Sequence, residues 1–424
     1  MAGLGTVGRE TVRLLLSNRE KFARRLGAKV ELAAVCDIDV SRKAQGLGLA
    51  RGVLRLKDPG KLAPLRNIDV IVELLGGLDA PRALVLAALR SGRHVVTANK
   101  RLLSHCWDEI ERARASRGGR LYFEGSVAGG IPILAALDGG FSANRIEAVY
   151  GILNGTTNYV LTRAEEGLGM AEALREAQQL GFAEKDPAAD MSGEDTAQKV
   201  SVLAALLTGR SLAPSRIARE GITRIEREDL DFARNSLNRA ARLLGALRLS
   251  GRDPVRVEAY VSPTLVPLGH PLAAVRREYN AVLVKASSAG ELMFYGKGAG
   301  AGPAASAVAG DVFMLCRDIL GKVPPRRSAA VRVELSPISE SVSSFYLRLS
   351  ARDRPGVLAR IAAALGRRGI SIASIHQSGV PRAAGVPVVI TTHPTTHGRF
   401  HAALHDILAL KSVARTHAVM RLFP

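Results

Sequence analysis

Acidic residues gather in one short stretch of this chain, close to a lysine. The protein carries a formal net charge of +20, yet five carboxylates fall within twelve of its residues. These are Glu184, Asp186, Asp190, Glu194 and Asp195. Any single ion pair there is most simply a surface salt bridge on a solvated loop. As a group beside Lys199, the acids suit a substrate that carries an ammonium group.

A helix is predicted to carry this lysine. Ser192 and Asp195 have the spacing of a helix-starting cap, with Asp in place of the usual Glu or Gln. Asp195 and Lys199 are four residues apart, so a helix places them on one face. The helix should bury an apolar stripe, formed by Val200, Leu203, Leu206 and Leu207.

A glycine-rich motif opens the chain. Gly3-Leu4-Gly5-Thr6-Val7-Gly8 matches the dinucleotide-binding fingerprint, in which glycines let backbone approach a pyrophosphate at a helix N-terminus. Asp37 or Asp39 ends the next predicted strand at a distance suited to a ribose hydroxyl. The fingerprint normally follows a buried strand, whereas only Met1 and Ala2 precede it. We favour an authentic start further upstream over a sheet that lacks this strand.

Other stretches place polar or small residues at the ends of predicted strands. Lys100 follows residues 94–97, where open α/β sheets bind ligands, although a water-facing lysine at a helix start fits equally well. The small residues between Glu124 and Ile131 could expose backbone carbonyls to a monovalent cation, or they could form a tight structural turn. Gly151–Tyr159 either lines a cleft or caps the following helix.

Composition excludes several classes of protein. A chain of 424 residues implies two to four domains. No apolar run approaches the length of a membrane span, and the N-terminus lacks a signal-peptide layout, so we expect a cytoplasmic protein. Cys36, Cys106 and Cys316 lack metal-ligand spacing and are expected to be buried free thiols.

The excess of basic residues raises the question of nucleic-acid binding. Lys and Arg number 59 against 39 acidic residues. Aromatic residues make up only 4%, which leaves few stacking platforms for single strands. The basic residues are also spread along the whole chain, so we expect no nucleic-acid partner. An anionic cofactor would benefit from a positive field, but this does not require +20.

The first 125 residues alternate short apolar runs with helical patterns, as a parallel α/β sheet requires. The predicted strands are Val30–Val35, Ile68–Leu74, His94–Thr97 and Leu121–Glu124. The predicted helices are Gly8–Leu26, Pro81–Ser91 and Leu103–Arg117. This alternation predicts a Rossmann-type domain.

The regular alternation of predicted strands and helices stops after about Gly151. Val255–Val261 and Ala281–Ala286 are predicted strands, Glu228–Leu249 a long helix, and Pro303–Ile319 a helix of small residues after a glycine-rich loop. Ser344–Phe423 has the strand–helix–strand–strand–helix–strand order of a ferredoxin-like fold. We predict four segments: a dinucleotide-binding domain (1–130), a mixed α+β catalytic and dimerisation domain (131–320, with about 303–320 returning to the first domain), a linker (321–342) and a C-terminal module (343–424).

Several of these motifs, in this order, resemble the homoserine dehydrogenase family. They are Gly-Leu-Gly-Thr-Val-Gly at 3–8, Thr-Ala-Asn-Lys at 97–100, Gly-Ile-Leu-Asn-Gly-Thr-Thr-Asn-Tyr at 151–159, the acidic stretch 181–199, and Gly-Lys-Gly-Ala-Gly-Ala-Gly-Pro at 296–303. The C-terminal module, with Asp353-Arg-Pro-Gly356, looks like an ACT domain. The resemblance implies NAD- or NADP-dependent interconversion of L-homoserine and L-aspartate 4-semialdehyde, a step towards threonine, methionine and isoleucine.

The resemblance also implies a role for individual residues. Lys199 would donate and accept the proton, and Lys100 would stand beside cofactor and substrate. The implied substrate-binding residues are Gly181, Glu184, Asp190 and Asp195. The implied cofactor-binding residues are Gly3, Gly5, Thr6, Val7, Gly8, Asp37, Leu75, Thr97, Lys100 and Gly298. The implied site for a monovalent cation, Na⁺ or K⁺, comprises Glu124, Val127, Gly129 and Ile131.

The chemistry of such a reaction agrees with a lysine base. Hydride leaves a primary alcohol carbon only if the hydroxyl loses its proton, so a general base must lie within hydrogen-bond reach. A lysine serves near neutral pH if desolvation or a second ammonium lowers its pKa, and Lys100 near Lys199 would be that second ammonium.

Departures from the family pattern leave cofactor preference open. Family members often carry Arg just before the acid that follows the second strand, where this chain has Cys36-Asp37. Asp37 would repel a 2′-phosphate and favour NAD, while Arg42 and Lys43 could still accept NADP. Ala304 replaces a common Thr after the second glycine loop.

The resemblance also implies binding partners, and the sequence allows one alternative function. The family pattern implies a small-molecule amino-acid substrate, an amino-acid effector such as threonine near Asp353–Gly356, and a homodimer or homotetramer, with no membrane partner. The alternative is a non-catalytic amino-acid sensor with a degenerate Rossmann domain, which the missing first strand would allow.

Overall fold

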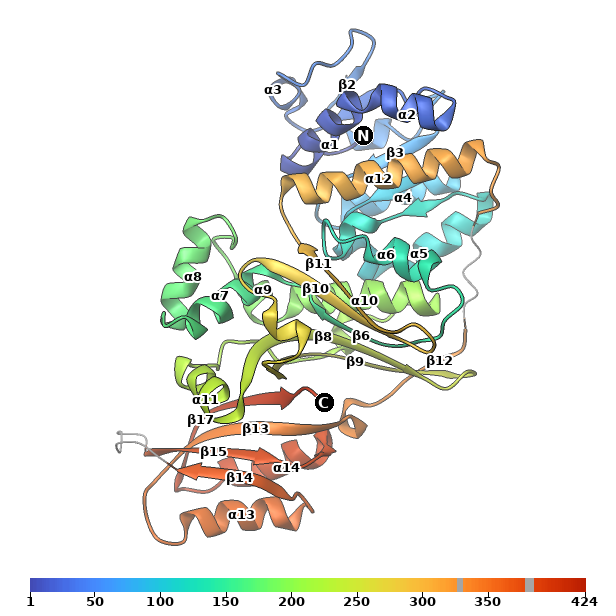
Figure 1. The fold of residues 1–424 in the computed structure, drawn as a ribbon. Coiled ribbons are helices and arrows are strands. Elements are labelled where there is room, and N and C mark those ends of the chain that lie inside the picture. Colours follow the sequence, from blue (N-terminus) through green and yellow to red (C-terminus); the bar gives the residue numbers. More distant parts are fainter. Residues whose placement is uncertain (326–330, 378–384) are drawn as a thin grey trace.

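The computed structural model describes residues 1–325, 331–377 and 385–424. Figure 1 shows the chain as three stacked parts, with the N-terminal domain at one end, a mixed sheet in the middle and the C-terminal module at the other end. The predicted fold class is confirmed, because a parallel Rossmann-type sheet, a mixed sheet and a ferredoxin-like module follow one another.

The N-terminal sheet is parallel throughout, in the order β2-β1-β3-β4-β5, with Ala2 bridging β1 and β3. Its strands are β1 (Ala34–Cys36), β2 (Leu54–Leu56), β3 (Val70–Glu73), β4 (His94–Thr97) and β5 (Leu121–Tyr122). Its helices are α1 (Thr6–Ser17), α2 (Arg19–Leu26), α3 (Val40–Lys43), α4 (Asp79–Arg90) and α5 (Lys100–Arg117).

The place of the apparently missing strand is filled. The Ala2 amide donates to Val72 O and Ala2 O accepts from the Leu74 amide, both at 2.8 Å. On its other side, the Cys36 amide donates to Met1 O at 2.8 Å. Two residues therefore hold the glycine loop in register with both neighbouring strands, so a missing strand no longer supports a degenerate Rossmann domain.

Two element predictions in this domain need correction. The strand expected at Val30–Val35 covers only Ala34–Cys36. The helix expected at Gly8–Leu26 is divided at Asn18, whose backbone leaves the helical region at φ −99° and ψ 7°. The Asn18 side chain donates to Leu14 O at 2.9 Å, so it satisfies a carbonyl at the end of α1.

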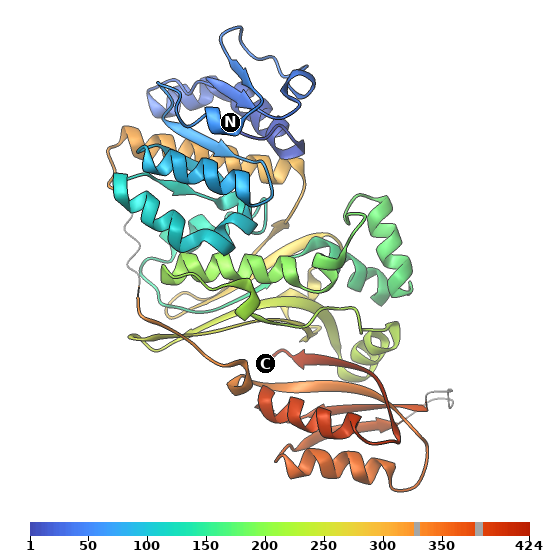
Figure 2. The ribbon, with the colours of Figure 1, turned by 180° about the vertical axis from the view of Figure 1, so that it is seen from behind.

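The middle domain is built on a sheet in the order β11-β10-β6-β8-β9, in which all these neighbours are antiparallel, and β7 adds a parallel pairing with β9. Its strands are β6 (Ile146–Ile152), β7 (Ala218–Arg219), β8 (Arg239–Ser250), β9 (Val255–Pro267), β10 (Tyr279–Ala286) and β11 (Gly290–Lys297). Its helices are α6 (Ile133–Ala135), α7 (Gly155–Glu165), α8 (Met170–Gln179), α9 (Ala188–Met191), α10 (Glu194–Thr208) and α11 (Arg227–Leu237). Figure 2 shows α10 lying between this sheet and the N-terminal domain.

The long helix predicted at Glu228–Leu249 is wrong. Helix α11 ends at Asn238, which adopts a left-handed conformation with φ +55°, and residues from Arg239 onward form β8. Most of β8 is buried, and the strand pairs along its whole length with β9. A strand that is apolar on both faces lacks the alternation that distinguishes strand from helix in sequence.

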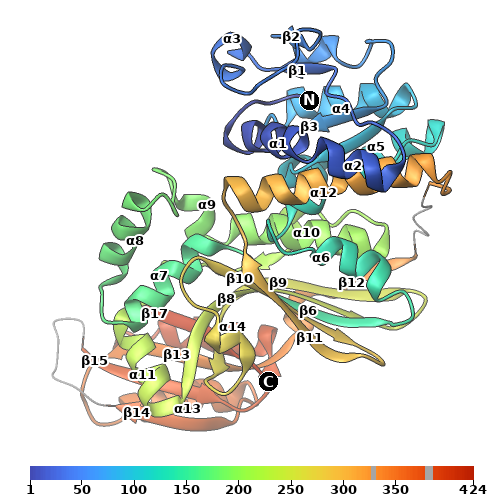
Figure 3. The same cartoon turned by 45° about the horizontal axis from the view of Figure 1, so that its top comes forward.

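Helix α12 (Ala301–Leu320) leaves the middle sheet and packs on α1 and α2. The rings of Phe22 and Phe313 lie 5.1 Å apart, and the Arg25 guanidinium lies 4.7 Å from the Phe313 ring centroid. Figure 3 shows α12 alongside the N-terminal helices. The chain therefore returns from the middle domain to the first domain, which helps to fix the glycine loop relative to α10.

The C-terminal module has the sheet order β17-β13-β15-β14 and its own buried core. Its elements are β13 (Val342–Ala351), α13 (Val357–Arg367), β14 (Ile372–Gln377), β15 (Val386–Thr392), β16 (Thr395–Thr396), α14 (His397–Leu408) and β17 (Val413–Leu422). Strand β17 pairs in parallel with β9, so the two sheets are continuous. The segment expected as a linker also contains β12 (Val333–Leu335), which pairs with β9.

A buried ion pair joins the C-terminal module to the middle domain. The Asp229 carboxylate on α11 is fully buried and accepts from Arg348 Nε at 2.6 Å and from Tyr346 Oη at 2.8 Å. It also accepts from the Glu226 amide at 2.8 Å, which completes the N-terminal cap of α11. The same carboxylate thus caps the N-terminus of α11 and neutralises the Arg348 guanidinium of β13.

Loss of Arg348 should therefore be costly. In an Arg348→Met variant Asp229 stays buried without its cation, so we expect the free energy of unfolding to fall by about 3–5 kcal/mol. Chemical denaturation followed by circular dichroism measures this loss. The matched control is Arg367→Met, since Arg367 is exposed. A loss in Arg348→Met no larger than in the control would contradict the importance of this pair.

Candidate active site

The carboxylate of Asp195 is the centre of the acidic stretch. Asp195 lies in the first turn of α10, and Lys199 lies one turn later. Lys199 Nζ donates to Asp195 Oδ2 at 2.7 Å, and Lys100 Nζ from α5 lies 3.3 Å from Asp195 Oδ1. The side chains of Asp195 and Lys199 are each 12% exposed. One carboxylate thus joins two lysines that come from different domains.

The ionisation of Asp195 reflects these partners. Burial by itself would raise the pKa of the carboxyl, but the positive charges of Lys199 and Lys100 outweigh it and hold the pKa well below its usual range. Asp195 is therefore an anion at every pH at which the protein would work. The sequence predicts that Lys100 acts directly on Lys199, whereas the structure joins both amines through this anion.

Lys199 keeps one bonding direction for a ligand. Its Nζ donates to Leu153 O at 2.6 Å and to Asp195 Oδ2 at 2.7 Å. An ammonium carries three N–H bonds, and among the described residues these two acceptors are its hydrogen-bond partners. Leu153 directly follows β6, so the C-terminal end of this central strand positions the lysine as directly as α10 does.

Asn154 connects two of the acids. Its Nδ2 donates to Asp190 Oδ1 at 2.7 Å and to Asp195 Oδ2 at 2.9 Å. Its Oδ1 accepts from the Thr157 amide at 2.8 Å and so caps α7. The sequence left open whether this stretch caps a helix or lines a cleft, and Asn154 both caps α7 and faces the acids. Sequence reasoning did not single out this residue.

The other implied substrate residues lie on an exposed loop. Gly181 has φ +77°, in the region that favours glycine, and Glu184 is exposed. The loop is tied to the start of α7, because Thr156 Oγ1 donates to Phe182 O at 2.6 Å. In the part of the chain that the structure describes, the Glu184 carboxylate has no hydrogen-bond or ion-pair partner, so it is available to an ammonium group.

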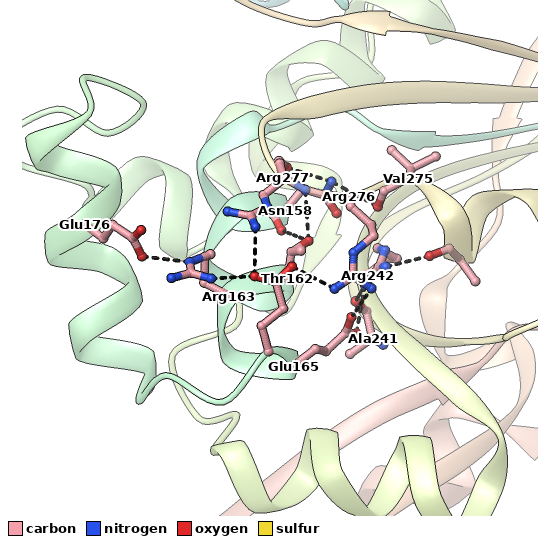
Figure 4. Close-up of polar contacts among 12 residues, drawn as sticks. Asn158, Thr162, Arg163, Glu165, Glu176, Ala241, Arg242, Val275, Arg276 and Arg277 are labelled. Carbon is pink, nitrogen blue, oxygen red and sulfur yellow. Dashed lines mark hydrogen bonds and ion pairs between the residues drawn. The ribbon is translucent and has the colours of Figure 1, made fainter.

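Helix α7 is anchored on several sides, as Figure 4 shows. Asn158 Nδ2 donates to Arg277 O at 2.9 Å and to Tyr279 O at 3.1 Å, which holds the turn that leads into β10. The fully buried Arg242 of β8 pairs with Glu165 at 2.8 Å. Arg163 reaches Glu176 of α8 at 2.8 Å. These contacts hold α7 in place along its length, from Asn158 near its start to Glu165 at its end.

The glycine loop fits a dinucleotide. A Cβ at Gly3 would lie 2.3 Å from Leu74 O, and one at Gly8 would lie 2.0 Å from Gly3 O, so neither position accepts a side chain. A Cβ at Gly5 would meet nothing within 4 Å, which leaves open space at the N-terminus of α1. Close packing at the first and third glycines with space at the second is what a bound pyrophosphate requires.

The groups expected near the ribose are already paired. Asp37 accepts from the Leu4 amide at 2.8 Å, from the Asp39 amide at 3.0 Å and from Lys43 Nζ at 2.9 Å. Burial opposes the charge on Asp37, but these hydrogen bonds prevail and lower the pKa of the carboxyl. Arg42 pairs with Asp39 at 2.5 Å on the surface. Asp37 thus holds the glycine loop as well as facing Lys43.

A buried acid that the sequence reasoning missed supports two implied cofactor residues. Glu73 ends β3 and is fully buried. It accepts from the Leu75 amide at 2.8 Å and from Thr97 Oγ1 at 2.6 Å. Burial raises the pKa of this carboxyl, and those hydrogen bonds oppose the increase. A charged residue at the end of an apolar strand was the available signal.

The second glycine loop packs on the turn expected to bind a cation. A Cβ at Gly129 would lie 2.4 Å from Gly298 O, and the Gly130 amide donates to Lys297 O at 3.0 Å. The Glu124 carboxylate accepts from the amides of Leu134 and Ala135 at 2.8 and 2.7 Å, so its side chain caps α6. Within the described residues, no group of three or more His, Cys, Asp or Glu side chains could hold a metal ion.

A cavity of about 340 Å³ lies in the C-terminal module, at the turn from β13 to α13. Arg352, Asp353, Arg354 and Gln377 contribute its polar lining. Gln377 Nε2 donates to Asp353 Oδ1 at 3.1 Å.

Among the described helices, none is long and apolar enough to cross a membrane.

Models of known protein families match most of the chain. The model described as "Homoserine dehydrogenase, NAD binding domain" matches residues 3–124, and "Homoserine dehydrogenase" matches residues 132–313. The model "ACT domain" matches residues 345–410. These matches confirm the resemblance drawn from the motifs and the predicted ACT module.

Individual proteins match along their whole length. A homoserine dehydrogenase of Neisseria gonorrhoeae is 38% identical and covers 100% of this chain and 97% of its own length. One of Mycobacterium tuberculosis is 38% identical, with 99% and 96% covered. The crystal structure of a homoserine dehydrogenase from Thiobacillus denitrificans superimposes with a TM-score of 0.89 at 36% identity, with 100% and 97% covered.

Proposed function

The chain belongs to the homoserine dehydrogenase family, and we propose that it interconverts L-homoserine and L-aspartate 4-semialdehyde with a nicotinamide cofactor, on the route to threonine, methionine and isoleucine. It is an oxidoreductase that acts on a primary alcohol. The observation that carries this proposal is the group formed by Lys199, Asp195 and Lys100, where the glycine-loop domain meets the middle sheet.

Lys199 exchanges the proton in this proposal. The cofactor supplies the hydride acceptor or donor when it is bound. During aldehyde reduction the third N–H of Lys199 donates to the carbonyl oxygen as the alcohol forms. In the reverse direction the neutral amine takes the hydroxyl proton. Leu153 O and Asp195 Oδ2 hold the nitrogen in one place, so the proton moves over a fixed distance.

Asp195 and Lys100 complete the charge balance around the reacting oxygen. Two ammonium groups side by side would repel each other, and the single anion between them offsets that repulsion. Lys100, which is 37% exposed, is free to contact a ligand on its outer side. This arrangement gives the developing alkoxide a positive environment without requiring the two amines to meet directly.

The acids hold the amino-acid end of the substrate. Glu184 and Asp190 face the substrate ammonium, and Gly181 contributes backbone. In this proposal the acids recognise the ammonium, and Lys199 carries out the chemistry at the alcohol. Such recognition positions the substrate, and positioning alone accounts for a large share of a barrier.

The glycine loop and its neighbours bind the cofactor. Gly3, Gly5, Thr6, Val7 and Gly8 surround the pyrophosphate in this proposal, and Leu75, Thr97 and Gly298 lie near the nicotinamide half. NAD is the preferred form, because a 2′-phosphate would meet Asp37 and Asp39, and because Lys43 and Arg42 are already paired with them.

A monovalent cation, Na⁺ or K⁺, binds the backbone carbonyls of Glu124, Val127, Gly129 and Ile131. In support, Ala128 and Gly129 have φ of +54° and +49°, so the turn reverses sharply there. Among the described residues, the carbonyls of Val127 and Gly129 accept no hydrogen bond. Bare carbonyl oxygens are hard ligands of the kind that alkali-metal ions accept.

The ACT module binds an amino-acid effector, and threonine fits its cavity chemistry. Asp353 offers a carboxylate to an ammonium, and Arg354 offers a guanidinium to a carboxylate. Assembly as a homodimer or homotetramer would cover the edge strand β11, where Leu292, Met293 and Tyr295 are exposed. Exposed apolar residues along an unpaired edge are typical of an interface.

Replacement of Lys199 tests the function. Lys199→Ala should lower kcat for semialdehyde reduction by a factor on the order of a hundred or more, with cofactor Kd unchanged, because only proton transfer is lost. Steady-state kinetics and fluorescence titration of the cofactor measure the two quantities. Lys185→Ala, an exposed lysine of the same stretch, is the control. Wild-type protein without turnover with NADH or NADPH would instead favour the sensor.

The charged residues expected near the cofactor ribose predict which cofactor the enzyme prefers. The wild type should have a higher kcat/KM and a lower Kd for NADH than for NADPH. Asp39→Asn removes a negative charge and frees Arg42, so the Kd ratio should move about fivefold towards NADPH. Glu20→Gln, on exposed α2, should leave the ratio unchanged. A wild type that prefers NADPH would refute the proposed role of Asp37 and Asp39.

The effector proposal predicts a response to millimolar threonine. The wild type should gain thermal stability and change its turnover, because the ligand binds only the folded module. Asp353→Asn should lose both responses, while Asp406→Asn, a surface carboxylate of α14 that pairs with Arg368, should keep them. No change in either melting temperature or activity of the wild type would exclude threonine as the effector.

A further inference from the structure

The carboxamide of Asn154 has a partner for each of its hydrogen-bonding positions. Its Oδ1 accepts from Thr157 N at 2.8 Å and from Thr157 Oγ1 at 3.1 Å. Its Nδ2 donates to Asp190 Oδ1 at 2.7 Å and to Asp195 Oδ2 at 2.9 Å. The side-chain amide therefore has a donor end and an acceptor end that face different parts of the site.

We propose that Asn154 is a positioning residue, which holds Asp190 and Asp195 together so that one faces the substrate ammonium and the other holds Lys199. This inference rests on the proposed function. Asn154 does not itself exchange a proton or touch the reacting atoms. It acts through the two carboxylates and through the start of α7.

Electrostatics explains why a neutral donor is needed here. Asp195 has Lys199 and Lys100 as cationic partners, whereas among the described residues Asp190 has no cation in contact. Two carboxylates that share a site disfavour double ionisation unless a donor lies between them. Nδ2, with its two N–H bonds, serves one oxygen of each acid and keeps both anions in place.

Local structure prevents the amide from turning over. Asn154 is 5% exposed, and its Oδ1 is committed to the N-terminus of α7. A reversed amide would present its oxygen to two carboxylates and its NH₂ to the Thr157 amide. The contacts of Glu165, Asn158 and Arg163 in Figure 4 fix α7 further along, so the helix cannot follow such a rotation.

The position of Lys199 depends on the same bridge. Asp195 Oδ2 accepts from both Asn154 and Lys199, which leaves Oδ1 directed to Lys100. Without Asn154, the carboxylate loses the contact that selects this orientation. Weaker substrate binding is then expected through Asp190, and slower turnover through Asp195 and Lys199.

Two substitutions separate this role from helix capping. Serine and aspartate both cap helices well, so Asn154→Ser should keep the melting temperature close to that of the wild type, and Asn154→Asp should do so at pH values where its carboxyl is protonated. Asn154→Ser removes the donor that bridges the acids. We expect its kcat/KM for L-homoserine to fall by about ten- to a hundredfold, through both KM and kcat, with an unchanged Kd for the cofactor.

Asn154→Asp gives a distinctive pH dependence. The new carboxyl lies against two carboxylates, so its pKa should be raised. Above that pKa it is an anion and repels Asp190 and Asp195, whereas below it the protonated acid donates a hydrogen bond, as Nδ2 does. Activity relative to the wild type should therefore increase as pH falls, and Asn154→Ser should show no such increase.

Asn144 provides the matched control. Its Oδ1 also accepts from two backbone amides, those of Ser288 and Ala289, but in an exposed turn away from the acids. Asn144→Ser and Asn144→Asp should leave kcat/KM unchanged. An active wild type with kcat/KM of Asn154→Ser within twofold of it would overturn this inference and leave the proposed function standing. A wild type without turnover would overturn the proposed function, and this inference with it.

Discussion

The arrangement of this site depends on one buried anion that touches two cations. Asp195 is ionised because Lys199 and Lys100 outweigh the cost of its burial. The two lysines come from helices of different domains, so the carboxylate is also a contact between domains. Removal of Asp195 would leave the two ammonium groups close together with no anion between them.

The rest of the fold holds these three charges at fixed positions. Helix α10 lies between α5 and the middle sheet, which brings Asp195 to Lys100. The crossing of α12 back to α1 fixes the glycine loop on the same side. Anchored helix α7 supplies Asn154, and the ion pair at Asp229 joins the ACT module to α11 of the same domain. A ligand of the module would therefore act on a domain that packs, through α11, against the helix that follows Asn154.

Local patterns in the sequence predicted the parts of the site that lie close together along the chain. The glycine loop, the helix with Asp195 and Lys199, and the ferredoxin-like module all have short-range signals. Asn154 and Glu73 were missed because their partners, Asp195 and Thr97, lie 41 and 24 residues away. The sequence of β8 predicts a helix, because a strand buried on both faces shows no alternation of apolar and polar residues. Only tertiary pairing determines such features.

The central claim is that the amine of Lys199 reaches the reacting oxygen while the acids hold the other end of the same molecule. A crystal structure of the protein with L-homoserine and the reduced cofactor, a pair that cannot react, tests it most directly. The account predicts Lys199 Nζ within hydrogen-bond distance of the substrate hydroxyl, with Asp195 still bound to Nζ and the ammonium at Glu184 or Asp190. A hydroxyl out of reach of Lys199, or an ammonium far from both acids, would contradict it.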